Sequence, residues 1–198
     1  QYVQANPMPR KIGLLLGLEL GLRIGEICGL QWGDFDLKLG TLKISRTVCR
    51  ISRGNGHTKV VIQTPKTRTS RREIPIPKCL LLMLKKLRGN ASNSTWFLSG
   101  NESKPTEPRC YRKSIKAYLK QAIVRQVRPH TLRHTFATTC LQAGCDVKTL
   151  SELLGHANAN ITLQRYVHSD LTRKRREMNR IFSYQVSVRN KKSLNLME

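Results

Sequence analysis

The chain has 198 residues, of which 36 are lysine or arginine and 12 are aspartate or glutamate, giving a formal net charge of +24. This length allows one large domain or two small ones with a hydrophobic core. So large a positive excess opposes folding unless phosphates neutralise it, which predicts nucleic acid as the partner. An anionic membrane is the weaker alternative, because no stretch is apolar enough to span a bilayer and no basic amphipathic helix lacks core-forming residues.

The first elements that we expect are helices. Residues 1–8 are mostly polar and are predicted to be an incoming linker, and Gln1 rather than Met at the start suggests a fragment of a longer protein. From Pro9, apolar residues at helical spacing predict a buried helix. A second short helix, holding Glu26, is expected after the glycines at 21 and 25.

A β region follows the two helices. Residues 41–51, 59–64 and 71–76 are rich in β-branched residues, and the segment 53–57 contains two glycines that suit a hairpin turn. We predict one three-stranded antiparallel sheet on the side that faces nucleic acid. The polar, basic segment 65–70 is expected to be a loop between the last two strands.

The remainder is predicted to be helical, apart from a turn-rich stretch at 89–108 in which Trp96 and Phe97 are expected to anchor the packing. The last segment, 183–198, contains the strand-like run 184–188. The helices that we expect span 78–88, 110–127, 131–143 after Pro129, 146–155 with Asp146 as cap, a helix from Asn160 or Thr162 that carries Tyr166, and the basic helix 170–182.

The residues with the strongest chemical signal lie between His130 and Tyr166. His130 and Arg133 are three apart, so both side chains share one helical face and could meet one phosphate. His156 follows a glycine, and a tyrosine near these groups can attack phosphorus. This pattern indicates a protein that cuts and rejoins a nucleic-acid backbone through a covalent bond to itself. His134 is expected to be structural, with core residues around it.

Zinc binding is an alternative for part of this segment. His130 with His134, and Cys140 with Cys145, fall within loose ligand spacings for structural zinc. A continuous helix between the two pairs would keep four ligands from converging, so we expect no metal site. The 6 cysteines are scattered along the chain, which indicates reduced thiols and a cytoplasmic protein.

Five segments in order resemble the tyrosine recombinases, the phage integrase family, and most of all the integrases of conjugative transposons and prophages. The similarity extends from about residue 9 to residue 181, and each segment alone would be weak. The segments are Gly21-Leu22-Arg23-Ile24-Gly25-Glu26, Thr64-Pro65-Lys66-Thr67, His130-x-x-Arg133, Leu154-Gly155-His156 and Arg165-Tyr166-Val167-His168.

The resemblance implies an α+β fold, a mainly helical catalytic domain with a small three-stranded antiparallel sheet near residues 41–76. It implies that residues 9–182 are this domain and that 1–8 link it to an N-terminal core-binding domain. Residues 183–198 would be a C-terminal tail that could be exchanged in trans between protomers.

The resemblance also implies a role for each site residue. Tyr166 would attack the scissile phosphate, leaving a 3′-phosphotyrosyl bond and a free 5′-hydroxyl, so that rejoining needs no ATP. Arg23 and Arg133 would hold the non-bridging oxygens, and with both in place we expect no metal and no cofactor. Lys66 would protonate the leaving oxygen. His130 would accept the tyrosyl proton or bind the phosphate, His156 would donate to the phosphate, and Glu26 would orient a catalytic side chain.

Basic side chains outside this set are expected to contact DNA: Arg68, Arg71, Arg72, Arg173 and Lys174. The implied partner is double-stranded DNA at the ends of a mobile element or at attachment sites. A homo-oligomer of two to four protomers, accessory DNA-bending proteins and a bacterial, nucleoid-associated location in the cytoplasm complete the expectation.

Two other functions fit part of the pattern. A type IB topoisomerase uses similar residues to relax supercoils, although the order of the segments around Lys66 and His156 favours a recombinase. A non-catalytic DNA-binding module would leave Tyr166 structural. The competing tyrosines Tyr111, Tyr118 and Tyr184 lie in no comparable sequence context.

Overall fold

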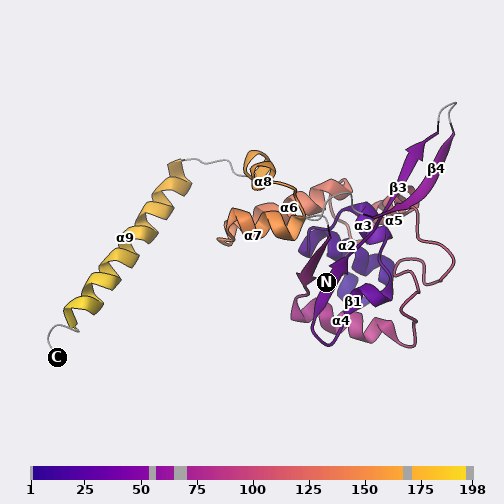
Figure 1. Cartoon of the computed structure of the whole chain (residues 1–198), viewed down its shortest axis with the longest axis horizontal. Helices are drawn as coiled ribbons and strands as arrows, with labels where there is room; N and C mark the ends of the chain where they lie inside the picture. Colours follow the sequence, from indigo (N-terminus) through magenta and orange to yellow (C-terminus); the bar gives the residue numbers. More distant parts are fainter. Residues whose placement is uncertain (1, 54–56, 65–70, 167–170, 195–198) are drawn as a thin grey trace. The chain divides into compact units, whose positions relative to one another are not determined.

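The computed structural model of the protein describes residues 2–53, 57–64, 71–166 and 171–194. The chain divides into two units, Gln1–Tyr166 and Val167–Glu198. The first unit contains eight α-helices and both sheets among its described residues, and the second contains the helix α9 (Leu171–Leu194) (Figure 1). The boundary after residue 166 falls inside the predicted domain 9–182, whose limits stay a prediction.

The N-terminal helices α1 (Tyr2–Ala5), α2 (Pro9–Glu19) and α3 (Ile24–Cys28) begin the first unit. Proline suits the first turn of α2, where its missing N–H would have no helical partner. Ile12 and Leu16 of α2 are fully buried. The phenol of Tyr111 donates to the Arg10 carbonyl at 2.7 Å, which ties α2 to a later helix.

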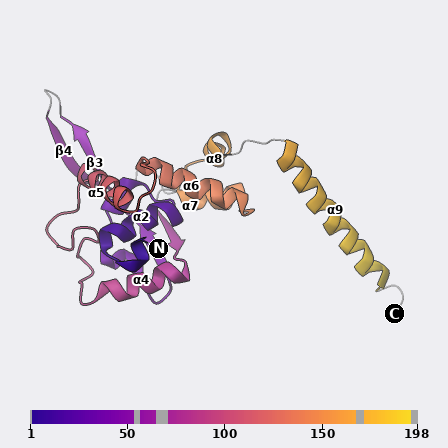
Figure 2. The same ribbon diagram turned by 180° about the vertical axis from the view of Figure 1, so that it is seen from behind.

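The strands form two separate sheets. The 3-10 helix η1 (Trp32–Asp34) precedes β1 (Phe35–Asp36), and β1, β2 (Thr41–Ile44) and β5 (Arg72–Pro75) make an antiparallel sheet in the order β1-β2-β5. Leu42 of β2 lies opposite Ile74 of β5, and both are buried in the core. The strands β3 (Thr47–Ser52) and β4 (Thr58–Gln63) pair only with each other and extend together away from the body (Figures 1 and 2).

The expected three-stranded antiparallel sheet is therefore present near residues 41–76, but its strands differ from those predicted. The segment 41–51 is interrupted at residues 45 and 46, where the side chain of Arg46 turns to Asp34, with Nη1 to Oδ2 at 2.9 Å. The interruption separates β2 from β3. The predicted strand 59–64, seen as β4, pairs with β3 in a separate two-stranded sheet, and β5 pairs with β2.

The second half of the first unit is helical: α4 (Lys78–Arg88), α5 (Pro108–Gln121), α6 (Pro129–Gln142), α7 (Val147–Leu154) and α8 (Ala159–Tyr166). Trp32, Phe35 and Phe97 pack together with ring centroids 5.0–5.6 Å apart, which confirms Phe97 as a packing anchor. The predicted cap of α7 is also confirmed, because the Asp146 carboxylate accepts from the Thr149 backbone N–H at 2.9 Å.

The ends of two helices and the type of one element differ from the prediction. The helix α9 ends at Leu194 instead of residue 182. The helix α5 ends at Gln121 instead of 127, and Ile123 beyond it has a positive φ of 54°, which a continuing helix does not allow. The run 184–188 is not a strand, since it lies within α9 (Leu171–Leu194). In the described part of the chain no strand pairs with this run, and a helix satisfies its backbone hydrogen bonds locally.

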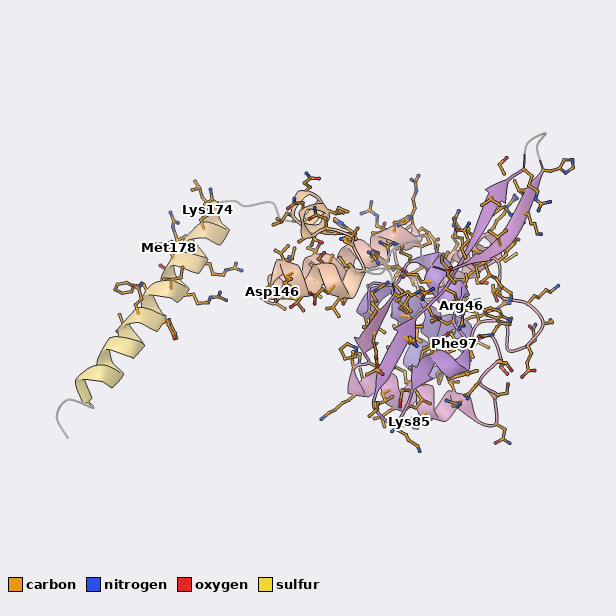
Figure 3. All side chains as sticks on the ribbon, viewed as in Figure 1. Arg46, Lys85, Phe97, Asp146, Lys174 and Met178 are labelled. Atoms are coloured by element: carbon orange, nitrogen blue, oxygen red, sulfur yellow. The ribbon has the colours of Figure 1, made fainter. Side chains whose placement is uncertain are left out.

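Within the described residues, no helix combines the length and the apolar character that crossing a membrane requires. The helix α9 is long but basic, and the exposed side chains of Lys174 and Met178 project from it (Figure 3). The 6 cysteines are free thiols, and Cys79 and Cys110 are exposed.

Candidate active site

Most of the catalytic residues that the sequence singled out line one hollow of the first unit. Its volume is about 430 Å³, and its walls come from the start of α3, from α6, from the turn after α7 and from the last residue of α8. Five predicted catalytic residues and one further histidine line it: Arg23, His130, Arg133, His134, His156 and Tyr166.

Arg23 is held at the start of α3 by Glu26. The backbone N–H of Arg23 donates to Glu26 Oε2 at 2.8 Å, and its Nη1 donates to Oε1 at 2.9 Å. The guanidinium also reaches the carbonyls of Leu154 at 3.3 Å and Gly155 at 3.4 Å. Because 37% of this side chain stays exposed, the guanidinium is both fixed and open to a ligand in the hollow.

Arg133 lies deeper in the same site and is 5% exposed. Its Nη1 donates to the Gly21 carbonyl at 2.7 Å, and its Nη2 donates to the Leu154 carbonyl at 2.7 Å. Burial, and then the nearby positive charge of Arg23, lower the pKa of Arg133 to about 10. An anion in the hollow would offset both effects, so the site is suited to a phosphate.

His156 is buried beside Arg133, and its hydrogen bonds define its protonation. Arg133 Nη2 lies 3.0 Å from His156 Nε2, and since a guanidinium only donates, Nε2 accepts. The ring proton then sits on Nδ1 and points to the Thr162 hydroxyl at 2.8 Å. In this neutral form Nε2 carries no proton and accepts from Arg133. The expected donation to a phosphate therefore requires both a proton on Nε2 and movement of Arg133 away from it.

Tyr166 ends α8 beside two imidazoles. Its ring is nearly parallel to that of His156, with centroids 6.3 Å apart, and lies 5.2 Å from that of His134. The expectation that His134 sits among core residues is wrong, because His134 is exposed and lines the hollow. Its spacing from His130 was the missed signal, since residues four apart share a helical face. Thr162, the partner of His156, was expected only as a possible start of its helix, and nothing in the sequence marked it as part of the site.

Glu26 has a second partner, Arg72, which was predicted from the sequence to contact DNA. Arg72 of β5 donates through Nη1 and Nη2 to the two oxygens of Glu26, both at 3.0 Å. Only 6% of the Arg72 side chain is exposed, so the expectation of a surface DNA contact is wrong for this residue in the structure. Burial alone would raise the pKa of Glu26, but the hydrogen bonds and charge of Arg72, and then Arg23, lower it below its usual value.

The other predicted residues lie elsewhere or outside the described residues. Lys66 and Arg68 fall in 65–70, and the side chain of Arg173 also lies outside the described set. Arg71 and Lys174 are exposed. Among the competing tyrosines, Tyr111 is fully buried and burial raises its pKa, Tyr184 lies on α9, and Tyr118 lines a different groove.

The fold and this arrangement of arginines, histidines and a tyrosine agree with one family. The chain belongs to the phage integrase family, whose model matches residues 1–173. It is 33% identical over 172 residues to a XerC-like tyrosine recombinase of Caldanaerobacter subterraneus subsp. tengcongensis, covering 78% of this chain and 44% of that protein. It is 28% identical to the transposase from transposon Tn916 of Enterococcus faecalis, covering 85% of this chain and 44% of that protein.

A solved structure gives the same picture. The Tn1549 transposon integrase in complex with circular intermediate DNA superposes with a TM-score of 0.70 at 26% identity, covering 91% of this chain and 63% of that one. The family and the mainly helical fold inferred from the sequence are thereby confirmed. The chain spans about half the length of the curated relatives that it matches.

Proposed function

We propose that this chain is the catalytic domain of a site-specific recombinase that cuts and rejoins double-stranded DNA to integrate and excise a mobile genetic element. The observation that supports this most directly is the convergence of two guanidinium groups and one phenol on a single hollow of about 430 Å³. Phosphoryl transfer needs positive groups on the non-bridging oxygens and a nucleophile in line with the leaving oxygen.

The proposed reaction begins when Tyr166 Oη attacks the scissile phosphorus. An O–P bond to the tyrosine forms, the P–O5′ bond breaks, and the chain keeps the DNA 3′ end as a phosphotyrosyl ester. Arg23 and Arg133 hold the non-bridging oxygens as charge builds on them. His130 takes the phenolic proton, and Lys66, assigned from the family's order of residues alone, gives one to the 5′-oxygen.

The second half of the cycle reverses these steps on a different strand. A 5′-hydroxyl from the partner DNA attacks the phosphotyrosyl ester and releases Tyr166, so the number of phosphodiester bonds is unchanged and no external energy source is needed. The Tn916 transposase and the DNA-bound Tn1549 integrase, both transposon proteins, support a mobile element as the source of the substrate.

The partners and location follow from this reaction. Exchange between two duplexes requires two to four protomers on DNA, and accessory DNA-bending proteins would bring distant sites together. Arg68, Arg71, Arg173 and Lys174 are proposed to contact the DNA backbone. The named relatives are bacterial, which supports a location in the bacterial cytoplasm with the nucleoid.

A covalent-adduct assay tests the proposal. The full-length gene product is incubated with a nicked duplex that carries the junction of the element, and the mixture is run on a denaturing gel. We expect a protein–DNA adduct that Tyr166→Phe abolishes while DNA binding persists, because only the nucleophilic oxygen is removed. Tyr118→Phe, which changes a tyrosine outside the hollow, is the matched control and should form the adduct.

Three outcomes would contradict the proposal. An adduct that survives Tyr166→Phe excludes this residue as the nucleophile. DNA binding by the wild type with no adduct points to a binding module. Relaxation of supercoiled DNA without any exchange of strands between duplexes points to a topoisomerase.

A further inference from the structure

The carboxylate of Glu26 contacts arginines from two parts of the chain. Its Oε1 accepts from Arg23 Nη1 at 2.9 Å and from Arg72 Nη1 at 3.0 Å. Its Oε2 accepts from the Arg23 backbone N–H at 2.8 Å and from Arg72 Nη2 at 3.0 Å. The carboxylate therefore joins an active-site arginine at the start of α3 to a buried arginine on strand β5.

Arg72 makes a further contact at the end of α7. Its Nε donates to the Leu153 carbonyl at 2.7 Å. The next two carbonyls accept from the site arginines, Leu154 from Arg133 at 2.7 Å and Gly155 from Arg23 at 3.4 Å. Three guanidinium groups thus bind three successive carbonyls at the negative end of one helix.

Gly155 allows this close approach. It has a φ of +62°, which favours glycine, and a Cβ at this position would lie 2.7 Å from Arg72 Nη1. The turn that brings His156 into the site is therefore packed directly against the Arg72 guanidinium.

We propose that Arg72 is a positioning residue for DNA cleavage, which acts through Glu26 and the α7 carboxyl end to hold the Arg23 guanidinium at the scissile phosphate. This inference rests on the proposed strand-transfer function. Without Arg72, the carboxylate of Glu26 loses two of its hydrogen bonds and keeps those from Arg23. The carboxylate and the Arg23 guanidinium can then rotate together. The Leu153 carbonyl and the Gly155 turn lose their common contact at the same time.

The alternative is that Arg72 only stabilises the fold. The structure offers a matched control, because Arg46 forms the same kind of pair with Asp34, at 2.9 Å and 3.2 Å, and Asp34 accepts from the Gln31 backbone N–H at 2.7 Å as Glu26 does from that of Arg23. Arg46 and Asp34 do not line the catalytic hollow. Removing either arginine disrupts one ion pair with a buried carboxylate, but only Arg72 connects to Arg23.

The first measurement is single-turnover cleavage of the nicked duplex at saturating protein, with the full-length gene product. We expect Arg72→Gln to slow cleavage by about 100-fold, as for a clamp displaced by roughly 1 Å. Arg72→Lys keeps the charge but not the two-pronged contact, and should be slowed less. Arg46→Gln should cleave at the wild-type rate. If Arg72→Gln does not fold, Arg72→Lys serves as the test variant.

The second measurement separates positioning from folding. A substrate with a methylphosphonate at the scissile position has one charged non-bridging oxygen replaced by a neutral methyl group, so it depends less on the arginine clamp. Release of the 5′-hydroxyl strand is measured on both substrates. If Arg72 acts through Arg23, the difference in rate between the wild type and Arg72→Gln should shrink at least tenfold on this substrate, because less charge must be held.

Each outcome is decisive. A rate difference of the same size on both substrates, or an equal loss in Arg46→Gln, would show a general structural role and overturn the inference. Wild-type cleavage by Arg72→Gln would overturn it as well, while leaving the proposed function intact. A wild type that forms no adduct would instead overturn the proposed function, and this inference with it.

Discussion

Arg133 is a charged residue in a place where charge is costly. Burial and the nearby charge of Arg23 lower its pKa to about 10, so keeping the guanidinium charged in the free protein costs free energy. Two carbonyls and His156 accept its hydrogen bonds, but none of these groups carries a negative charge. A bound phosphate would supply a negative charge, so the energetic cost in the free protein would favour binding of such a ligand.

We therefore expect a phosphate-like oxyanion such as vanadate to stabilise the wild type. At 100 times its Kd the gain would be about 2.7 kcal/mol, or roughly 5–10 °C in Tm. Arg133→Gln should lose most of this shift, measured by thermal unfolding with and without the anion. An equal shift in both proteins would mean that the anion acts on the overall positive charge and not on this site.

Glu26 gives the site a dependence on pH. Its pKa is lowered in the folded protein, so the stabilisation is fully present above the unfolded value of 4.5 and is lost as the pH falls through the lower, folded value. We expect the free energy of unfolding of the wild type to fall more steeply than that of Glu26→Gln between about pH 5 and pH 3, measured by urea titration. Parallel curves would show that folding does not lower the pKa of Glu26.

At the scale of elements, α6 does most to assemble the site. Its helical period places His130, Arg133 and His134 on adjoining parts of one face. A single helix therefore provides three of the side chains that line the hollow. The turn after α7 and the end of α8 bring His156 and Tyr166 to this face. The helix α8 has only 8 residues, and a helix this short is not stable by itself. The position of Tyr166 at its end therefore depends on contacts with neighbouring helices.

The contact between α6 and α8 predicts a role for His134. An aromatic pair contributes about 0.5–1.5 kcal/mol, so His134→Ala should slow cleavage by about 3- to 10-fold by freeing Tyr166. His134→Phe keeps the ring contact and should retain most of the rate in the single-turnover assay. If phenylalanine is as harmful as alanine, the imidazole acts chemically and not only by packing.

At the scale of the whole molecule, the net positive charge suits the proposed DNA partner. The net charge of +24 makes release of counterions the main source of sequence-independent affinity. The positive charge also lies on both units, since α9 contributes exposed cations such as Lys174 and Arg176.

We expect the affinity for DNA to fall steeply with salt, with a log–log slope of about −0.9 for each phosphate contacted. Lys174→Gln should make the slope less negative by about one unit without changing the order of preference among DNA sequences. The measurement is fluorescence anisotropy across a salt series. A slope near zero would argue against backbone contacts, and an unchanged slope would remove Lys174 from them.

The sequence by itself determined the features that depend on composition or on short spacing. The net charge predicted a nucleic-acid partner, and the three-residue interval from His130 to Arg133 predicted their shared face. Local capping chemistry located the start of α7 at Asp146. The order of five short segments was enough to place the chain in its family, whose model matches residues 1–173.

Only the tertiary structure decided which distant groups meet. The pairs Arg72–Glu26 and Arg72–Leu153 join residues 46 and 81 positions apart, and β5 pairs with β2 instead of the nearer β4. Arg72 was predicted to contact DNA because an arginine in a basic stretch looks the same in sequence whether it is solvated or buried. The difference lies in the free energy of burying a charge, which becomes favourable only when the fold supplies its partner.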